Sequence, residues 1–212
     1  MKNFCCFLLF LCTLAAIPAF ADGDVTIFGA VQHQGKLTLQ SASATVNPCV
    51  TTFTTQCNFN PGSFGVFGAR FSHGKVVGGE HTLAYVSNFL GGGAKAFIYN
   101  SDFMVQAPLP KVRPYAVAGL GTIFTWGSNS TGQPDFSKIG TKFALNYGGG
   151  LKIFPAGPVG VRFDIRGYAI PSAAFNLPAL ANAGSQSPFA TVKSQTQTLN
   201  LLEVGLGVVF KF

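Results

Sequence analysis

Residues 201–212 read LLEVGLGVVFKF, and every second side chain in this stretch, from Leu202 to Phe212, is apolar. The alternate positions hold Glu203, two glycines and Lys211 among others. A period of two is typical of a β-strand with one apolar face and one mixed face. In a soluble protein the apolar face packs on a core, whereas in a membrane barrel it faces lipid and the mixed face lines the lumen. The remaining sequence distinguishes between these two structures.

The composition favours an all-β membrane barrel. Of the 212 residues 48% are hydrophobic and only 10% are charged, whereas an average soluble domain has roughly 25% charged residues. The 26 glycines and 22 phenylalanines disfavour long helices and suit short strands. After residue 21 the hydrophobicity is spread over short alternating segments, none of them long enough for a transmembrane helix. The length predicts one domain.

Residues 1–21 have the features of a signal peptide. A basic start precedes an apolar run over residues 4–17, and residues 19–21 form an A-x-A cleavage site. We therefore expect a barrel domain over residues 22–212, exported through the inner membrane after cleavage. An uncleaved anchor is the alternative, but Pro18 and the small residues end the apolar run where a peptidase would cut.

Two cysteines remain in the expected mature chain, Cys49 and Cys57, in one polar stretch rich in threonine. In an exported protein we expect them to form a disulfide. The loop that it closes is short, so the expected stabilisation is about 2–3 kcal/mol. Two free thiols and a partial metal site are the alternatives, and no histidine is close in sequence. We expect no metal and no cofactor, because the three histidines lack metal-ligand spacing.

Short alternating segments predict eight strands. They span residues 24–33, 64–72, 80–89, 95–106, 113–126, 141–154 and 159–170, followed by a last strand that ends at Phe212. The first, fifth and seventh connections are long, the second, fourth and sixth are short, and only the third, rich in glycine, departs from this alternation. Outer-membrane barrels have long extracellular loops and short periplasmic turns. The sequence thus predicts an eight-stranded antiparallel up-and-down transmembrane β-barrel.

Alternation along each strand assigns its side chains to two faces. Predicted outward side chains include Phe67, Phe71, Leu83, Tyr85, Phe89, Phe97, Phe103, Tyr115, Val117, Ile123, Phe143, Leu151, Val161, Phe163 and Ile165. The predicted inward charges are Arg70, Glu80, Asp102, Lys152, Arg162, Asp164, Arg166 and Glu203. An eight-stranded barrel is only wide enough for its side chains to fill, so these opposite charges should pair and close the lumen. We expect Glu203 to pair with Arg162 or Arg166, and a solvated rim is the alternative position for Glu80 and Lys152.

Four segments resemble the small eight-stranded outer-membrane barrels of Gram-negative bacteria, the OmpA/OmpX-like family. They are RPYAVAGLG (113–121), NYGGGLK (146–152), VGVRFDIR (159–166) and VVFKF (208–212), and the first half of the chain matches only in pattern. The resemblance implies a monomer in the outer membrane, in contact with membrane lipid and lipopolysaccharide. It also implies that the barrel-assembly machinery recognises Phe210 and Phe212 as an assembly signal.

The expected function is that of a non-enzymatic outer-membrane protein with a plugged polar lumen. Its role would be structural, or a surface interaction in which the extracellular loops contact a ligand or a host surface. A small porin-like channel, a lipid A-modifying enzyme and a soluble periplasmic barrel with an apolar ligand are the alternatives. Lipid A deacylases among the barrels that the chain resembles use an H-x-S-N-like stretch. The nearest match here, at residues 86–88, lacks the histidine. Nucleic-acid binding is disfavoured, because the basic residues are scattered and the protein is expected to be exported.

Overall fold

The computed structural model describes residues 23–35, 37–41, 56–59, 62–90, 93–127, 139–171, 176–178, 191–194 and 198–212, with the backbone alone for 37–41, 56–59, 176–178 and 191–194. The expected signal peptide, residues 1–21, lies outside the described residues. So do Cys49 and the side chain of Cys57. Cleavage after Ala21 and the disulfide therefore stay predictions.

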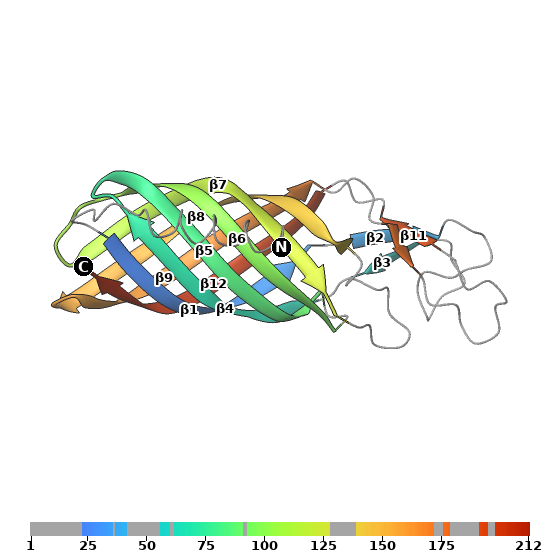
Figure 1. The fold of residues 1–212 in the computed structure, drawn as a ribbon, viewed down its shortest axis with the longest axis horizontal. Coiled ribbons are helices and arrows are strands. Elements are labelled where there is room, and N and C mark those ends of the chain that lie inside the picture. Colours follow the sequence, from blue (N-terminus) through green and yellow to red (C-terminus); the bar gives the residue numbers. More distant parts are fainter. Residues whose placement is uncertain are drawn as a thin grey trace, which may run out of the picture.

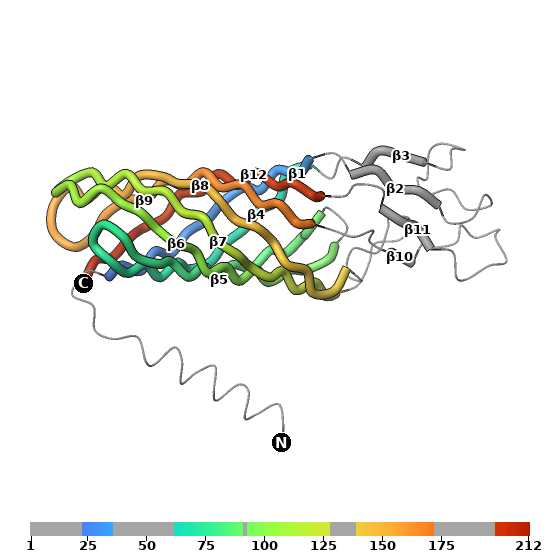
Figure 2. Tube along the Cα trace, turned by 90° about the horizontal axis from the view of Figure 1, so that it is seen from above, coloured from blue at the N-terminus to red at the C-terminus, as the bar shows by residue number. Residues whose placement is uncertain are grey.

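Eight long strands form a closed antiparallel barrel (Figures 1 and 2). They are β1 (Gly23–Gln34), β4 (Ser63–His73), β5 (Val77–Phe89), β6 (Ala94–Gln106), β7 (Val112–Trp126), β8 (Thr141–Ala156), β9 (Val159–Pro171) and β12 (Thr198–Lys211). The strands agree with the predicted ones to within a few residues, because alternating apolar side chains mark the same segments. The predicted all-β, eight-stranded up-and-down architecture is confirmed. In the described part of the chain, no helix has the length and apolar character needed to cross a membrane.

The barrel closes between the first and last strands. The strand order is β1-β12-β9-β8-β7-β6-β5-β4, and β1 pairs with both β12 and β4. The Gly23 amide donates a hydrogen bond to the Phe212 carbonyl oxygen (3.2 Å), and the Phe212 amide donates one to the Gly23 carbonyl oxygen (3.0 Å). Closure leaves these eight strands without a free edge.

The connections differ in length between the two ends of the barrel. At the end where Phe212 lies, residues 74–76, 107–111 and 157–158 join neighbouring strands. We call this the short-turn end. The opposite end, called here the long-loop end, carries the connections after β1, β5, β7 and β9. Only the connection between β5 and β6 is short there, as the sequence indicates.

A second, four-stranded sheet lies beyond the long-loop end (Figure 1). It contains β2 (Leu37–Ser41), β3 (Gln56–Phe59), β10 (Asn176–Pro178) and β11 (Thr191–Ser194), in the order β10-β11-β2-β3. The antiparallel pairing of β11 with β2 links the first and last long connections. Sequence analysis predicts polar loops here, since strands this short carry too little alternation to be distinguished from a loop.

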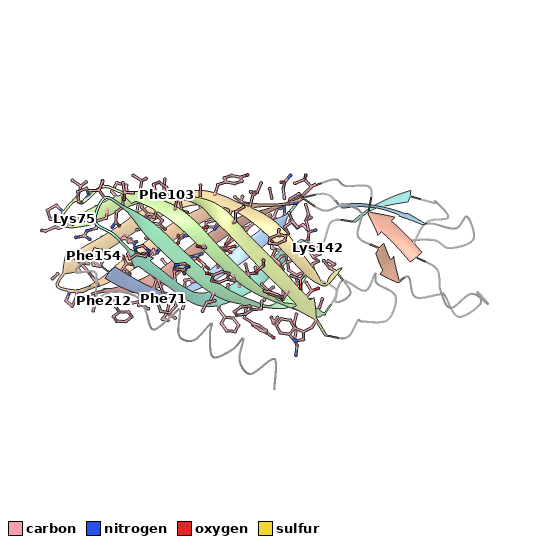
Figure 3. All side chains as sticks on the ribbon, turned by 45° about the horizontal axis from the view of Figure 1, so that its top comes forward. Phe71, Lys75, Phe103, Lys142, Phe154 and Phe212 are labelled. Atoms are coloured by element: carbon pink, nitrogen blue, oxygen red, sulfur yellow. The ribbon has the colours of Figure 1, made fainter. Side chains whose placement is uncertain are left out.

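The outward face of the barrel is apolar around its circumference. Large exposed side chains include Ile27, Phe67, Phe103, Leu120, Phe143, Ile165, Leu206 and Phe212. Figure 3 shows Phe71, Phe103 and Phe212 on the outside of the barrel. Exposed apolar area of this extent is unusual for a soluble monomer and indicates contact with an apolar surrounding.

Four side chains predicted to point outward, on two strands, point inward. Phe89 is buried inside, because the register shifts between Val86 and Phe89 and an irregularity of this kind reverses the alternation. On β7, Tyr115, Val117 and Ile123 are also buried inside. Both faces of this strand carry apolar or small side chains, so hydrophobicity alone does not determine which face points inward.

Candidate functional site

The candidate site is the barrel lumen, and its half near the short-turn end is filled by charged side chains. All eight predicted inward charges lie here, and none is more than 4% exposed. They are Arg70, Glu80, Asp102, Lys152, Arg162, Asp164, Arg166 and Glu203, contributed by six strands. We call this set, together with Asp24, the ion-pair layer. Glu80 and Lys152 therefore lie in the interior and not at a solvated rim.

Glu80 and Asp164 lie between the arginines of β9. Arg162 Nη2 is 2.7 Å from Glu80 Oε2 and 3.1 Å from Asp164 Oδ1. Arg166 pairs with Glu80, with Asp164 (3.3 Å) and with Asp102 (3.1 Å). Buried charges are tolerated when each is paired and hydrogen-bonded, and these groups meet that condition jointly.

Arg70 is the partner of Glu203, and the predicted pairing of Glu203 with Arg162 or Arg166 is wrong. Arg70 Nη2 is 2.6 Å from Glu203 Oε1, and Arg70 Nη1 is 2.7 Å from Asp164 Oδ2. Arg166 is the direct neighbour of Glu203 across β9 and β12, but its guanidinium is engaged by three other carboxylates. A long side chain inside a narrow barrel reaches strands that are not adjacent to its own, which a pairing based on neighbouring strands does not consider.

Two members of the site were missed by sequence analysis. Asp24, the first residue of its predicted strand, pairs with Lys152 (Oδ2 to Nζ, 2.6 Å). The Tyr115 hydroxyl donates to Asp164 and accepts from Arg162 Nε (2.9 Å). The guanidinium carbon of Arg162 lies 4.4 Å from the centre of the Tyr115 ring, a cation–π contact. The signal that could have placed Tyr115 inside is the glycine that faces it on the next strand.

Glycines on β8 provide the space for these large groups. Gly150 is the cross-strand partner of Tyr115, and a Cβ on it would collide with the Phe163 carbonyl oxygen and lie 2.6 Å from the Tyr115 hydroxyl. A Cβ on Gly148 would lie 3.1 Å from Arg166 Cγ. The pairing of β8 with its neighbours runs through the three glycines without a break, so the missing side chains leave space and do not interrupt the sheet.

The half of the lumen near the long-loop end is mainly apolar, and Gln34 is a buried polar side chain there. Its buried side chains include Phe64, Val66, Val86, Phe89, Leu90, Ile98, Ile123, Ile139, Ile170, Leu199 and Leu201. We call this set the apolar layer. Phe64 and Phe89 pack edge to face across it, with ring centres 5.6 Å apart. The expected polar lumen is therefore mainly polar in one half and mainly apolar in the other.

The two layers determine what the lumen offers chemically. Each of its four cations is paired with at least one of its five carboxyl groups, so no cation of the ion-pair layer is left for a ligand. No group of three His, Cys, Asp or Glu side chains in the described ranges is arranged to hold a metal ion. The arrangement fills the barrel interior with buried side chains.

Comparison with known proteins identifies the family. The profile described as outer membrane protein β-barrel domain matches residues 7–212. The chain belongs to this outer-membrane β-barrel family. Membership places the barrel in the outer membrane and explains its apolar outward face, which contacts lipid. No curated protein matches the sequence.

Solved outer-membrane barrels are similar to this chain at low sequence identity, and OprG shares its fold. Outer membrane protein OprG from Pseudomonas aeruginosa is 10% identical, with a TM-score of 0.54 over 91% of this chain and 97% of that one. The N-terminal β-barrel domain of Pseudomonas aeruginosa OprF is 13% identical, with a TM-score of 0.49 over 90% and 98%. Neisserial surface protein A (NspA) is 15% identical, with a TM-score of 0.49 over 90% and 97%.

Aromatic side chains of this outer-membrane barrel gather near both ends of the lipid-facing wall. Towards the long-loop end, the Tyr85 ring centre lies 5.2 Å from that of Phe67 and 6.1 Å from that of Trp126. Phe103 and Phe212 lie towards the short-turn end. Such rings at two levels suit the two membrane–water interfaces.

Proposed function

We propose that the protein is a closed, non-conducting and non-enzymatic outer-membrane barrel that presents its long connections at the cell surface. One observation carries this proposal: the ion-pair layer and the apolar layer are stacked along the lumen. A hydrated ion would have to disrupt buried ion pairs and then pass through an apolar layer that offers few hydrogen-bonding partners. Both steps are strongly unfavourable.

The long connections lie at one end of the barrel and the short turns at the other, which supports an orientation with the long-loop end facing the cell exterior. Outer-membrane barrels place long loops outside and short turns in the periplasm. The second sheet then lies beyond the membrane and gives the first and last outer connections a shared backbone framework. Such a framework suits contact with an extracellular ligand or a host surface.

The orientation has a direct test. An epitope tag inserted between β9 and β12 should bind antibody on intact cells. The matched tag in the turn at residues 107–111 should bind only after the outer membrane is permeabilised. The reverse pattern would contradict the proposed orientation.

A small channel is the alternative that the apolar layer disfavours. Lipid vesicles containing the purified protein should retain a trapped small sugar as well as protein-free vesicles do. We expect the same for Arg162→Ala, because the apolar layer still closes the other half of the lumen. Rapid efflux through the unmodified protein would support the channel.

A lipid-modifying enzyme is favoured by one contact. His33 Nδ1 and Ser63 Oγ lie 3.1 Å apart on the lipid-facing wall, and both residues are exposed. A serine beside a histidine is the start of a nucleophilic site, although catalysis also needs a group that orients the histidine and donors for an oxyanion. Mass spectrometry of lipid A from cells with and without the protein tests this role, and we expect identical acylation in both.

The proposal also covers how the protein reaches the outer membrane, by cleavage of a signal peptide and recognition of its last strand. Cleavage after Ala21 would leave β1 intact, since this strand begins at Gly23. Phe210 and Phe212 project outward from the strand that closes the barrel, where the assembly machinery could recognise them.

A further inference from the structure

The ion-pair layer carries one negative charge in excess, because its described members are four cations and five carboxylates. Asp102 is the least compensated of these carboxylates. Its cation partner is Arg166, whose Nη1 lies 3.1 Å from Oδ2, and this arginine is shared with Glu80 and Asp164. A buried charge without a counter-charge is strongly unfavourable. A group that balances the excess is therefore expected beside Asp102.

Buried oxygen atoms without a hydrogen-bond partner gather around this carboxylate. In the described part of the chain they are Asp102 Oδ1, Asn146 Oδ1, Asn100 Oδ1 and Thr82 Oγ1. These four residues are at most 4% exposed. Buried polar atoms in proteins are nearly always paired, so a cluster of exceptions indicates a ligand.

Cross-strand pairing places the four side chains in one patch of the lumen wall. Asn100 on β6 is the direct neighbour of Thr82 on β5. Asp102, the next inward residue of β6, faces Gly119 on β7, and Asn146 faces the same glycine from β8. Asn146 Nδ2 donates a hydrogen bond to Asp102 Oδ2 across this glycine (2.8 Å). The Oδ1 atoms of both side chains stay available.

Two glycines bring the oxygens over one strand. A Cβ on Gly119 would collide with Asp102 Oδ1, and a Cβ on Gly121 would collide with Asn100 Oδ1. The glycines are successive inward positions of β7, so the two oxygens lie over neighbouring positions. The patch lies where the two layers of the lumen meet, since the next inward residue of β6 is Ile98 of the apolar layer.

We propose that this patch binds one monovalent alkali cation, with Asp102 Oδ1 as the charged ligand. The side-chain oxygens of Thr82, Asn100 and Asn146 would be its neutral ligands. Carboxylate, amide and hydroxyl oxygens are the groups that hard cations prefer. Because the ion-pair layer lies on one side and the apolar layer on the other, the ion would be taken up as the barrel folds and then held, not conducted.

A monovalent ion fits this patch better than a divalent ion or a proton. A divalent ion would leave the layer with excess positive charge, and calcium takes about six to eight oxygen ligands. A proton on Asp102 would balance the charge, but it would donate to a single acceptor and leave the other oxygens unpartnered. Metal-ligand spacing among histidines does not detect a site of this kind, which is built from amide and hydroxyl oxygens.

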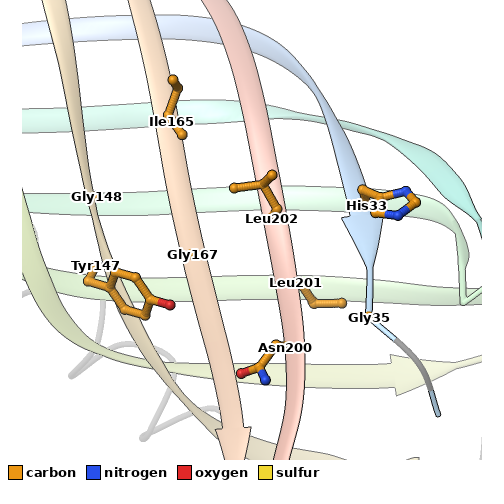
Figure 4. A pocket seen from close by; sticks show the side chains of 9 residues that line it. All are labelled: His33, Gly35, Tyr147, Gly148, Ile165, Gly167, Asn200, Leu201 and Leu202. Atoms are coloured by element: carbon orange, nitrogen blue, oxygen red, sulfur yellow. The ribbon is translucent and has the colours of Figure 1, made fainter.

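The hollow on the lipid-facing wall offers no comparable site. It opens across β1, β12, β9 and β8 with a volume of about 400 Å³ (Figure 4). The described residues that line it include no carboxylate, and Ile165 and Leu202 contribute apolar surface. A cation therefore finds a counter-charge in the lumen and none in this hollow.

The test is urea unfolding of the full barrel in phosphatidylcholine vesicles at increasing sodium chloride, with choline chloride keeping the ionic strength constant. Because only the folded barrel would hold the ion, the equilibrium constant of unfolding should fall by up to about tenfold for each tenfold rise in sodium. Asp102→Asn removes the excess charge at nearly the same size and should lose this dependence.

A second pair of variants tests the neutral ligands. Thr82→Val removes one oxygen and keeps the shape and charge of the lumen, so it should need several-fold more sodium for the same stabilisation. Thr122→Val is the matched control, because it makes the same change on the outward face of β7. It should respond to sodium like the unmodified protein. A gel comparing unheated and boiled samples verifies that each variant is folded.

Three results would overturn the proposal. Unfolding of the unmodified protein that is independent of sodium would leave water or a proton as the partner of these oxygens. Equal sodium dependence of Asp102→Asn and the unmodified protein would assign the ion to another part of the chain. Equal dependence of Thr82→Val and Thr122→Val would contradict the assigned ligands. Sodium linkage and conductance are measured separately, so failure of this site is distinguishable from failure of the proposed function.

Discussion

At the residue scale, Glu80 links two arginines of the lumen, because its carboxylate forms ion pairs with both. Its carboxylate contacts Arg162 (2.7 Å) and Arg166 and is fully buried. Removing one partner from a buried ion pair leaves uncompensated charge and costs about 3–5 kcal/mol. We expect Glu80→Ala to lower the free energy of unfolding by that amount, measured by urea unfolding in lipid vesicles. Lys75→Ala at the exposed short-turn end is the control, and equal stability of the two variants would contradict the buried pairing.

Tyr115 gives a second residue-scale prediction. Its hydroxyl bonds Asp164 and Arg162, so Tyr115→Phe leaves these buried charges with fewer partners. We expect a loss of about 1–3 kcal/mol in the free energy of unfolding. Tyr85→Phe, on the lipid-facing wall, should leave stability unchanged. A Tyr115→Phe variant as stable as the parent would show that the hydroxyl contacts contribute nothing.

Side-chain partners were the least predictable feature of the site. Charge on the inward face of a strand follows from alternation, because a charge facing lipid is unfavourable. The partner of each charge does not follow, since Arg70 crosses β1 to reach Glu203 and stacks over the Phe28 ring at 3.6 Å. Such contacts depend on where every side chain of the closed lumen lies.

At the element scale, some strand glycines are required because a larger side chain would collide with its neighbours, and others are not. Gly150→Ala would bring a Cβ into the Phe163 carbonyl and towards Tyr115. We therefore expect it to reduce the yield of folded barrel, measured as the fraction that migrates differently in unheated and boiled samples. Gly29→Ala is the matched control, because a Cβ there meets nothing within 4 Å. A folded fraction equal to that of Gly29→Ala would show that β8 accommodates the added atom.

The last strand carries the proposed assembly signal. We expect Phe212→Ala to lower the amount of folded barrel in the outer membrane, with unfolded protein accumulating in the periplasm. Phe103→Ala removes a similarly exposed phenylalanine at the same end, from a strand that does not close the barrel. Fractionation with heat-shift gels measures both, and an equal effect of the two changes would exclude a signal specific to Phe212.

Strand existence was predictable and strand irregularity was not. The eight barrel strands follow from period-two alternation, whereas the reversal at Phe89 depends on a register shift between two paired strands. The second sheet depends on the pairing of β11 with β2, whose residues are far apart in sequence. Local sequence patterns contain no information about either.

At the scale of the whole molecule, the lumen is filled in two different ways along its axis. The charged half was predictable from the inward charges of β4, β8 and β9. The apolar half was not, because inward residues such as Phe64 and Ile123 are as hydrophobic as the outward ones, and alternation in hydrophobicity then gives no direction. The sequence therefore predicted a plug of charges and missed the layer stacked on it.

Single-channel recording of the unmodified protein in a planar lipid bilayer tests the closed lumen most directly. The folded barrel, verified by its heat-dependent gel migration, should insert without producing conductance steps above the protein-free baseline. Sustained, reproducible steps from samples free of other porins would contradict the account, because they require a continuous water path through both the ion-pair layer and the apolar layer.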